Sequence, residues 1–513
     1  MGILSLIILA PLVAAGALLL IPGFSKGAIR LVSLIGSLVT LVACIYVACA
    51  YDMAAGGIQF REEIMILPRL GIAWKLGADG WAIALLLLTA IIIVAGVFAT
   101  WTLEDRPKEF YGFLLLLVAG VFGVFVSLDL FIFFLFYEIA VLPMYLLIGI
   151  WGTSKEVKRG GPLGFVWNRL NIGERKYAAM KLTIMLLVGS AFILAAFLGM
   201  VQEGGGHTWD LEKLQDVKYS SELQWWAFPA LWIGFGSLAG LFPWHTWSPD
   251  GHASAPTAVS MLHAGVLMKL GAFGLIRVGM VCLPEGAADW AFIVGCVAII
   301  NIVWGALSAM GQTDLKYIIA YSSVSHMGIV MLGAATMTVA GWNGAIYQMV
   351  AHGVMTGLFF ALVGLVYDRA HNREIFQMGG FASAMPAVAV FFTLAALSSL
   401  GMPGTAGFTA ELQVFIGAWQ SQWSWWAIPA IAGALFTAFY VLRGVRAIFW
   451  GQGPAPQYTD LKDANGTEWV ALIMLGGAII LFGVYPNLLL DFIDPTTTPF
   501  LEKVTSIMTG GAP

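Results

Sequence analysis

The stretch LFIFFLFYEIAVLPMYLLIGIW, residues 130–151, holds one charged side chain, Glu138, among aromatic and aliphatic residues. It is long enough to cross a bilayer as a helix, which takes about 20 apolar residues. Because a helix rises about 1.5 Å per residue, Glu138 lies roughly 12 Å along the segment, near the predicted midplane of the membrane. A charge at that depth is costly, so the stretch predicts a membrane helix with a functional carboxylate.

The composition of the whole chain also indicates a membrane protein. Of the 513 residues, 60% are hydrophobic and 11% are charged, whereas soluble proteins average about 25% charged residues. The net charge is −4, and the basic residues lie mostly in loops without interleaved aromatic residues, which argues against nucleic acid as a partner. The cysteines lie in apolar spans without spacing for zinc, a cluster or haem, so we expect packing roles for Cys44, Cys49, Cys282 and Cys296.

Apolar stretches of span length predict an all-α polytopic membrane protein with about fourteen transmembrane helices. The first stretch, residues 3–21, fills a whole span and has no basic residue before it, so we expect a membrane helix and not a signal peptide. The expected helix centres are Leu12, Leu41, Ala90, Val118, Ala140, Val188, Gly236, Leu267, Val297, Val330, Gly357, Leu400, Leu435 and Leu475.

The distribution of Lys and Arg predicts the orientation. About seventeen fall in or beside the odd-numbered loops and about five in the even-numbered ones, so we expect cytoplasmic odd loops and both termini outside a bacterial inner membrane. A label at Lys158 is then reachable only from the cytoplasm, and one at Ala512 only from outside. The most basic loop is the fifth, residues 152–181, with Lys155, Lys158, Arg159, Arg169, Arg175 and Lys176.

Two predicted spans carry helix-breaking residues at membrane depth. The seventh contains Gly240 and Pro243, and the twelfth contains Gly401, Pro403 and Gly404. Irregular backbone is tolerated at this depth only where it is buried in protein or lines a hydrated cavity. A single break can be a packing kink, but two breaks about five spans apart, each beside ionisable residues, favour a transporter built from inverted repeats.

Other ionisable residues also lie inside predicted spans. Each buried charge costs about 2.5–3.5 kcal/mol on insertion scales, so mid-span groups such as Glu138, Lys269 and Glu411 favour a proton relay. His263 and Lys269 are six residues apart, so on an α-helix they face different sides. The full set of candidates is Glu138, His263, Lys269, Lys316, His326, His352 and Glu411.

For some of these candidates a structural role is an open alternative. His326 and His352 fit a hydrogen bond between helices as well as a relay. Lys316, beside Asp314 at a helix start, fits an orientation signal better than a relay. The sequence shows no catalytic triad order, no phosphate-binding loop and no metal spacing, so we expect no other catalyst.

Two motifs carry a resemblance to a known family. The segments FPWHTWSPDGHASAPTAVSMLHAGVLMKLGAFGLIR (242–277) and TDLKYIIAYSSVSHMG (313–328), with Pro143 five residues after Glu138, resemble the antiporter-like subunits of respiratory complex I, NADH:quinone oxidoreductase. The resemblance covers about spans four to thirteen. It is greatest to the M type (chain 4), because Glu411 stands where related types carry lysine. The chain also ends soon after span fourteen, without the long lateral helix of the L type.

The resemblance implies a proton channel of two inverted five-helix repeats with a polar midplane axis. Glu138 matches the fifth-span glutamate, Lys269 the eighth-span lysine and Glu411 the outlet glutamate, while His326 and His352 match polar residues between the halves. The implied divisions are 1–110 (helices 1–3), 111–282 (first repeat, helices 4–8), 283–450 (second repeat, helices 9–13) and 451–513 (helix 14 and C-terminal tail).

One position departs from the family pattern. The family usually carries a lysine five residues before Pro243, where this chain has Leu238, so Ser237 and Leu238 supply no cation for Glu138. His263 is also unusual for the M type. These departures imply either a modified relay, in which Lys269 acts on Glu138 through water and His263, or a scaffold that no longer conducts.

The resemblance further implies a proton-translocating subunit of an NADH:quinone oxidoreductase-like complex. It implies no cofactor in this chain, with flavin, iron–sulfur clusters and quinone in partner subunits. Expected partners are the other membrane and peripheral subunits, including the paralogous antiporter-like ones, and lipid. The alternatives are a subunit of a multisubunit Mrp-type cation/proton antiporter, against which Glu411 argues, and one of a ferredoxin- or hydrogenase-linked complex. The electron donor, the quinone type and the choice of H+ or Na+ stay open.

Overall fold

The computed structural model describes residues 2–154, 174–451, 456–458 and 461–508. Lys155, Lys158, Arg159, Arg169 and Ala512 lie outside the described residues. Within the described part, 13 helices are long and apolar enough to cross a membrane. The twelfth predicted span is divided into two shorter helices by its break. The polytopic helical architecture is therefore confirmed.

The long elements follow the predicted order of spans. The main helices are α1 Ile3–Leu20, α2 Lys26–Ala50, α3 Gly80–Ala99, α4 Pro107–Val126, α5 Leu130–Trp151, α7 Arg175–Glu203, α9 Ser221–Ala239, α10 Trp247–Ser254, α11 Thr257–Leu262, α12 Met268–Gly274, α13 Pro284–Met310, α14 Leu315–Ala335, α15 Val339–Ala370, α16 Pro386–Ser399, α17 Ala406–Gln420, α18 Ala427–Phe449, α19 Gly466–Val484 and α20 Asn487–Met508.

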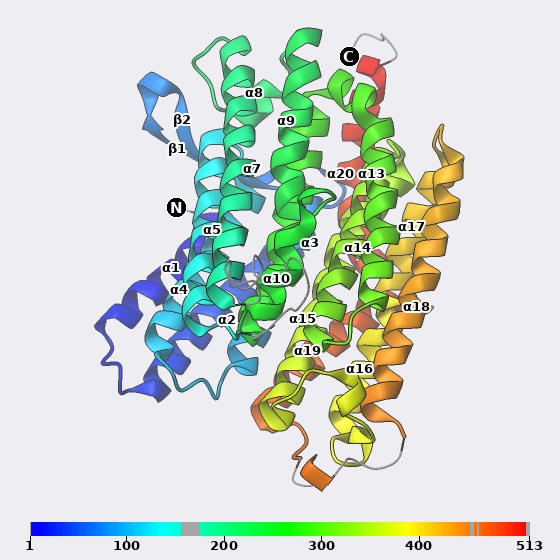
Figure 1. The fold of residues 1–513 in the computed structure, drawn as a ribbon. Helices are drawn as coiled ribbons and strands as arrows, with labels where there is room; N and C mark the ends of the chain where they lie inside the picture. The colour runs from blue at the N-terminus through cyan, green and yellow to red at the C-terminus, as the bar shows by residue number, and fades with distance from the viewer. Residues whose placement is uncertain (1, 155–173, 452–455, 459–460, 509–513) are drawn as a thin grey trace, which may run out of the picture.

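The helices form one bundle with two ends (Figure 1). The connections after α15 and α18 lie at the lower end of the view, and the connection between α7 and α9 lies at the upper end. The spans Thr257–Met280 and Val339–Ala370 are buried along their whole apolar windows, whereas α1, α2 and α18 expose much of theirs. A polar group within either of these two windows is therefore shielded from lipid.

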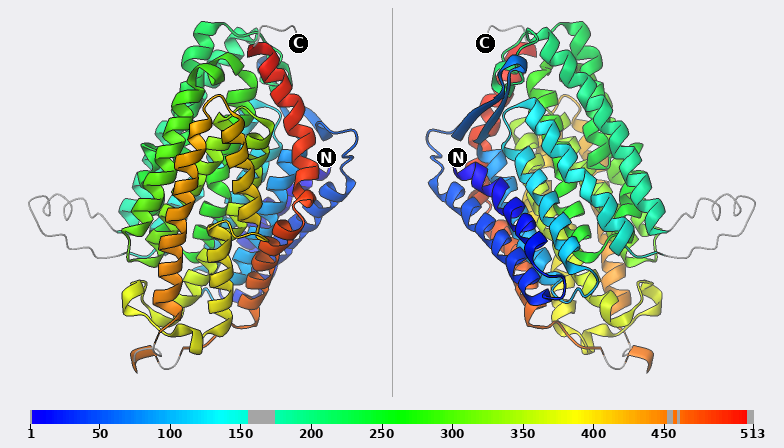
Figure 2. Two further views of the ribbon diagram at one scale, coloured as in Figure 1. Left: turned by 90° about the vertical axis from the view of Figure 1, so that its right-hand side faces the viewer. Right: turned by 90° about the vertical axis from the view of Figure 1, so that its left-hand side faces the viewer.

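Two elements outside the spans were not predicted. A hairpin of β1 (Gln59–Leu67) and β2 (Ile72–Ala78) pairs antiparallel between α2 and α3. Helix α20 replaces the expected C-terminal tail, and Figure 2 shows it beside the hairpin. It contains Pro495 and Pro499, and Thr496 and Thr497 anchor it to α3 by accepting hydrogen bonds from Gly80 N and Trp81 Nε1, both at 3.0 Å.

The hairpin also closes the start of α1. The Glu62 carboxylate accepts hydrogen bonds from the backbone of Gly2 and Leu4 at 2.8 Å and from Ser5 Oγ at 2.5 Å. Partial burial alone would raise the pKa of Glu62, but these donors outweigh it and hold the pKa below its usual value. The acidic side chain therefore supplies the cap that the N-terminal residues of α1 lack.

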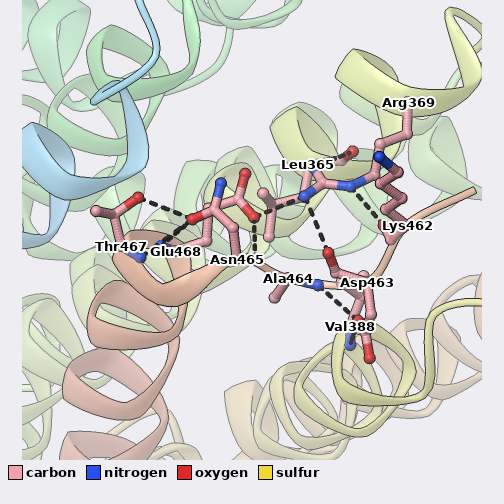
Figure 3. Close-up of polar contacts among 9 residues, drawn as sticks. All are labelled: Leu365, Arg369, Val388, Lys462, Asp463, Ala464, Asn465, Thr467 and Glu468. Atoms are coloured by element: carbon pink, nitrogen blue, oxygen red, sulfur yellow. Dashed lines mark hydrogen bonds and ion pairs between the residues drawn. The ribbon is translucent and has the colours of Figure 1, made fainter.

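At the end of the bundle opposite the hairpin, a cluster of polar residues joins the ends of three helices (Figure 3). Asn465 and Glu468 form a capping box at the start of α19. Arg369 of α15 donates to Glu468 at 2.6 Å and to the Lys462 carbonyl at 2.6 Å. Asp463 accepts from the first turn of α16, including Ala387 N at 2.8 Å. This cluster fixes the ends of α15, α16 and α19 relative to one another.

Candidate functional site

The break in the seventh span lies inside the protein. Helix α9 ends at Ala239, Gly240 has φ 72°, and helical structure resumes near Trp244. The freed backbone N–H of Phe242 donates to Asn301 Oδ1 at 2.8 Å, and Asn301 Nδ2 donates to the Val324 carbonyl at 2.7 Å. The predicted break is confirmed, and α13 supplies the polar partner that its backbone needs.

Lys269 lies at the centre of the eighth span. The span changes from α-helical to π-helical geometry at His263–Leu267 and again at Leu275–Met280, on either side of Lys269. Such π-helical turns are frequent at functional sites. The Lys269 ammonium donates to the carbonyl of Ala264 within the first π-helical stretch, and its Nζ lies 2.7 Å from His352 Nδ1. Because an ammonium group only donates, His352 Nδ1 is the acceptor when Lys269 is charged.

His352 of α15 leads to His326 of α14. Their rings stack with centroids 5.2 Å apart. Both ring nitrogens of His326 face backbone carbonyls, Nδ1 that of Ser322 at 2.8 Å and Nε2 that of Ser399 at 3.1 Å. A His326 imidazole that is protonated on both ring nitrogens would therefore have an acceptor for each N–H.

Glu411 of α17 completes this row beside the second break. Its Oε1 lies 3.6 Å from His326 Nε2. Gly401, between α16 and α17, has φ 70° and leaves no room for a Cβ beside the Glu411 carboxylate. The predicted break of the twelfth span is confirmed, and it brings the Ser399 carbonyl and Glu411 to the same histidine.

These contacts make a continuous buried row, which we call the central polar row: Lys269, His352, His326 and Glu411. All four residues are at most 4% exposed. They come from α12, α15, α14 and α17, so the row runs across helices and not along one of them. It joins residues 269 and 411 through direct side-chain contacts.

His263 lies in a second cluster that sequence analysis identified only in part. Its ring lies 4.0 Å from that of His252 and 5.0 Å from that of Trp247, measured between centroids. Both histidines are fully buried, and none of their ring nitrogens has a hydrogen-bond partner among the described residues. The sequence analysis did not select His252, although it stands in the quoted motif SPDGH. The available signal was a histidine close to the helix break at Gly240 and Pro243.

Lys316 is buried and not on the surface. The residue is 4% exposed, and Nζ donates to the carbonyl of Ala255 at 2.7 Å, just beyond α10. Nearby, Asp250 accepts from Lys181 Nζ at 2.7 Å and from Tyr317 Oη at 3.0 Å. Lys316 therefore lies between the second histidine cluster and one end of the bundle.

Glu138 is not joined to the central polar row. Ser190 of α7 lies beside its carboxylate, and Glu138 Oε1 is buried without a hydrogen-bond partner in the described part of the chain. No ion pair reaches it among those same residues. Leu238 is fully buried, and Phe235, one turn earlier on α9, packs on Tyr137 with ring centroids 6.2 Å apart. Position 238 of the seventh span is thus a buried leucine that supplies no cation for Glu138.

The predicted packing roles of the cysteines fit the buried Cys44 and Cys282, but Cys49 is exposed on α2 and Cys296 is partly exposed. Within the described residues, no group of three or more His, Cys, Asp and Glu side chains is arranged to hold a metal ion.

Comparisons with known proteins agree with the geometry. Residues 171–437 match the family model described as NADH:quinone oxidoreductase/Mrp antiporter, TM. NAD(P)H-quinone oxidoreductase chain 4 1 of Picosynechococcus sp. is 37% identical over 97% of this chain and 91% of its own length. NAD(P)H-quinone oxidoreductase chain 4 of Gloeobacter violaceus is 36% identical over 98% and 93%.

Solved structures match over nearly the whole fold. A chain of respiratory complex I from Thermus thermophilus is 28% identical with a TM-score of 0.87, covering 98% of this chain and 99% of that one. A chain of the Mrp complex from Dietzia sp. has a TM-score of 0.83 at 20% identity, covering 98% of each. The second likeness concerns the fold alone.

Proposed function

Because the chain belongs to the family of transmembrane subunits shared by NADH:quinone oxidoreductases and Mrp antiporters, we propose that it moves protons as the M-type subunit of an NADH:quinone oxidoreductase-like complex. The observation that carries this proposal is the central polar row, a line of four acid and base side chains in contact inside the membrane. Flavin, iron–sulfur clusters and quinone belong to partner subunits, and the redox reaction occurs there.

The row supplies the steps of a proton relay. Lys269 passes a proton from Nζ to His352 Nδ1, to which it is hydrogen bonded. The stacked rings of His352 and His326 need a bridging water or a ring rotation for the next step. His326 then passes a proton to Glu411 at 3.6 Å. Because every member is buried, a proton placed on one of them can leave only through the others or through water.

Glu411 is the proposed outlet of this relay. A cavity of about 850 Å³ lies beside the same helix, α17, and is lined by Gln413 of α17, Asn343 of α15 and Asp494 of α20. Asn343 Nδ2 donates to Asp494 at 2.7 Å, so the polar lining continues to the C-terminal helix. This polar cavity supports release of protons at the end of the bundle where α17 ends.

The two breaks support the proposed repeats, residues 111–282 and 283–450. The first three spans, in residues 1–110, precede the repeats. The fourteenth span, α19, and the C-terminal segment, in residues 451–513, follow them. In the first repeat, we propose that Lys269 is the cation that acts on Glu138, with the His252–His263 pair between the two halves.

The alternative of a scaffold that no longer conducts protons rests on Leu238. The central polar row does not depend on that position.

We place the protein in the bacterial inner membrane with the odd-numbered connections in the cytoplasm. Single cysteines at Glu104 and Lys213, whose side chains are 71% and 73% exposed, test this orientation. In a background without the native cysteines, an impermeant maleimide should reach Glu104→Cys only from the cytoplasmic side and Lys213→Cys only from outside. Labelling of both from one side would contradict the proposed topology.

The Mrp-type antiporter remains the second candidate, because the fold is shared with the Dietzia complex. Purification with partners in mild detergent separates the two. We expect flavin, iron–sulfur and quinone-binding subunits to co-purify, and the flavin type and electron donor preference to distinguish a ferredoxin- or hydrogenase-linked complex. Recovery of small membrane subunits alone, without redox centres, would favour the antiporter and contradict the proposed function.

A further inference from the structure

A cavity of about 430 Å³ lies where α18 ends, between that helix and the segment that follows α15. Arg443, Arg446 and Trp450 line it from the α18 side, and Phe376 lines it from the other. It lies at the end of the bundle that holds the connections after α15 and α18 (Figure 1). It is separate from the central polar row.

Among the described residues, the cavity carries positive charge without a balancing acid. No carboxylate of that part of the chain lines it, and neither arginine forms an ion pair there. Arg443 donates one hydrogen bond, to the Gln312 carbonyl at 2.9 Å, while its Nε is buried without a partner there. Three residues apart on a helix, the two arginines are neighbours on one face. A guanidinium with unused donors is suited to bidentate binding of phosphate.

The rim of the cavity carries exposed aromatic side chains, as is typical of a membrane interface. Trp450 is 59% exposed and Phe376 is 65% exposed, and the Arg443 guanidinium lies 5.9 Å from the centre of the Phe376 ring. Tryptophan is enriched at the headgroup level of membranes, where one part of the ring is apolar and another is wet. The cavity therefore lies at the depth where phospholipid headgroups are found.

An apolar stripe on α18 leads directly to the arginines. The exposed residues of this stripe recur every three or four positions, continue to Arg446 and Trp450 with the same spacing, and comprise Ile428, Ile431, Leu435, Phe439 and Leu442. Residues with this spacing share one face of a helix. A ligand that fits both parts has an anionic head and long apolar chains, which distinguishes a phospholipid from free phosphate.

We propose that this cavity binds an anionic phospholipid. The phosphate lies against Arg443 and Arg446, and the acyl chains lie along the stripe on α18. Arg446, which is exposed, makes the outer contact, and the buried Arg443 Nε makes the inner one. This proposal does not depend on the relay.

Titration of phosphatidylglycerol into the delipidated complex, followed by native mass spectrometry, tests the site. We expect the Arg443→Gln/Arg446→Gln complex to bind one lipid fewer than wild type, or to bind it at least tenfold more weakly. Lys26→Gln/Lys108→Gln removes the same charge at the same end of the bundle and should bind like wild type. Arg446→Gln alone, at an exposed position, gives the same direction of change if the double variant does not assemble.

Three results would overturn the proposal. The first is unchanged phosphatidylglycerol binding in both arginine variants. The second is equal occupancy by phosphatidylcholine, or full displacement by inorganic phosphate, which would assign the cavity to a different ligand. The third is loss of a neighbouring subunit from the arginine variants with no change in bound lipid, which would make the surface a protein interface.

Discussion

Glu411→Gln in the assembled complex should reduce the number of protons moved per electron pair. The amide keeps the size of the carboxylate and its place beside Gly401, so the packing around the second break is preserved. However, an amide does not take up and release a proton, and the relay then loses its outlet. We expect proton transfer through this chain to slow at least tenfold, which corresponds to about 1.4 kcal/mol in the barrier.

The measurement is the proton-to-electron ratio in well-coupled vesicles, with NADH oxidation by an artificial acceptor as a second readout. That second activity and the subunit composition should stay at wild-type levels. Glu104→Gln is the matched control, because it neutralises an exposed carboxylate at the end of the bundle, where Glu104 pairs with Lys26 and Arg30. A normal ratio in Glu411→Gln vesicles would give Glu411 a structural role only.

The sequence predicted the elements whose energetics are local. Long apolar stretches have no alternative to membrane helices, so the spans around Leu12 or Leu475 followed from composition. Gly240 and Gly401 marked the two breaks because both adopt the left-handed conformation that glycine favours. The deep positions of Lys269 and Glu411 followed in the same way from their place in the spans.

What the sequence did not predict depends on contacts between distant segments. The hairpin and α20 are held by groups such as Glu62 and Thr496, whose partners lie far away in the chain. The sequence argument for His263 and Lys269 assumed a regular α-helix, whereas His263–Leu267 is π-helical. The two side chains nevertheless face different partners, His252 and His352 respectively. The approach of Lys269 to His352 joins two helices with no local signal, so only the fold reveals it.

Neither Glu138 nor Lys269 forms an ion pair with a described residue. Among those residues, the Lys269 ammonium contacts a carbonyl and an imidazole but no carboxylate. Leu238 stands where, by the family resemblance, a lysine would supply the charge for Glu138. In a medium of low polarity, opposite charges act over longer distances: about 1.4 kcal/mol at about 12 Å if the effective dielectric constant is about 20. The proposed relay treats each group as the counter-charge for the other.

We expect Glu138→Gln and Lys269→Ala each to impair proton translocation severely, and the double variant to be hardly worse than either. Residues that act in one network give non-additive losses, whereas independent sites give losses that add within about 0.5 kcal/mol. Lys316→Ala is the matched control, since it removes another buried lysine, bonded to Ala255, and its loss should add to that of Glu138→Gln. Proton-to-electron ratios of all the single and double variants complete the cycle. Additive losses for Glu138→Gln with Lys269→Ala, or a harmless Lys269→Ala, would mean that Leu238 has separated the two halves and that Glu138 acts without Lys269.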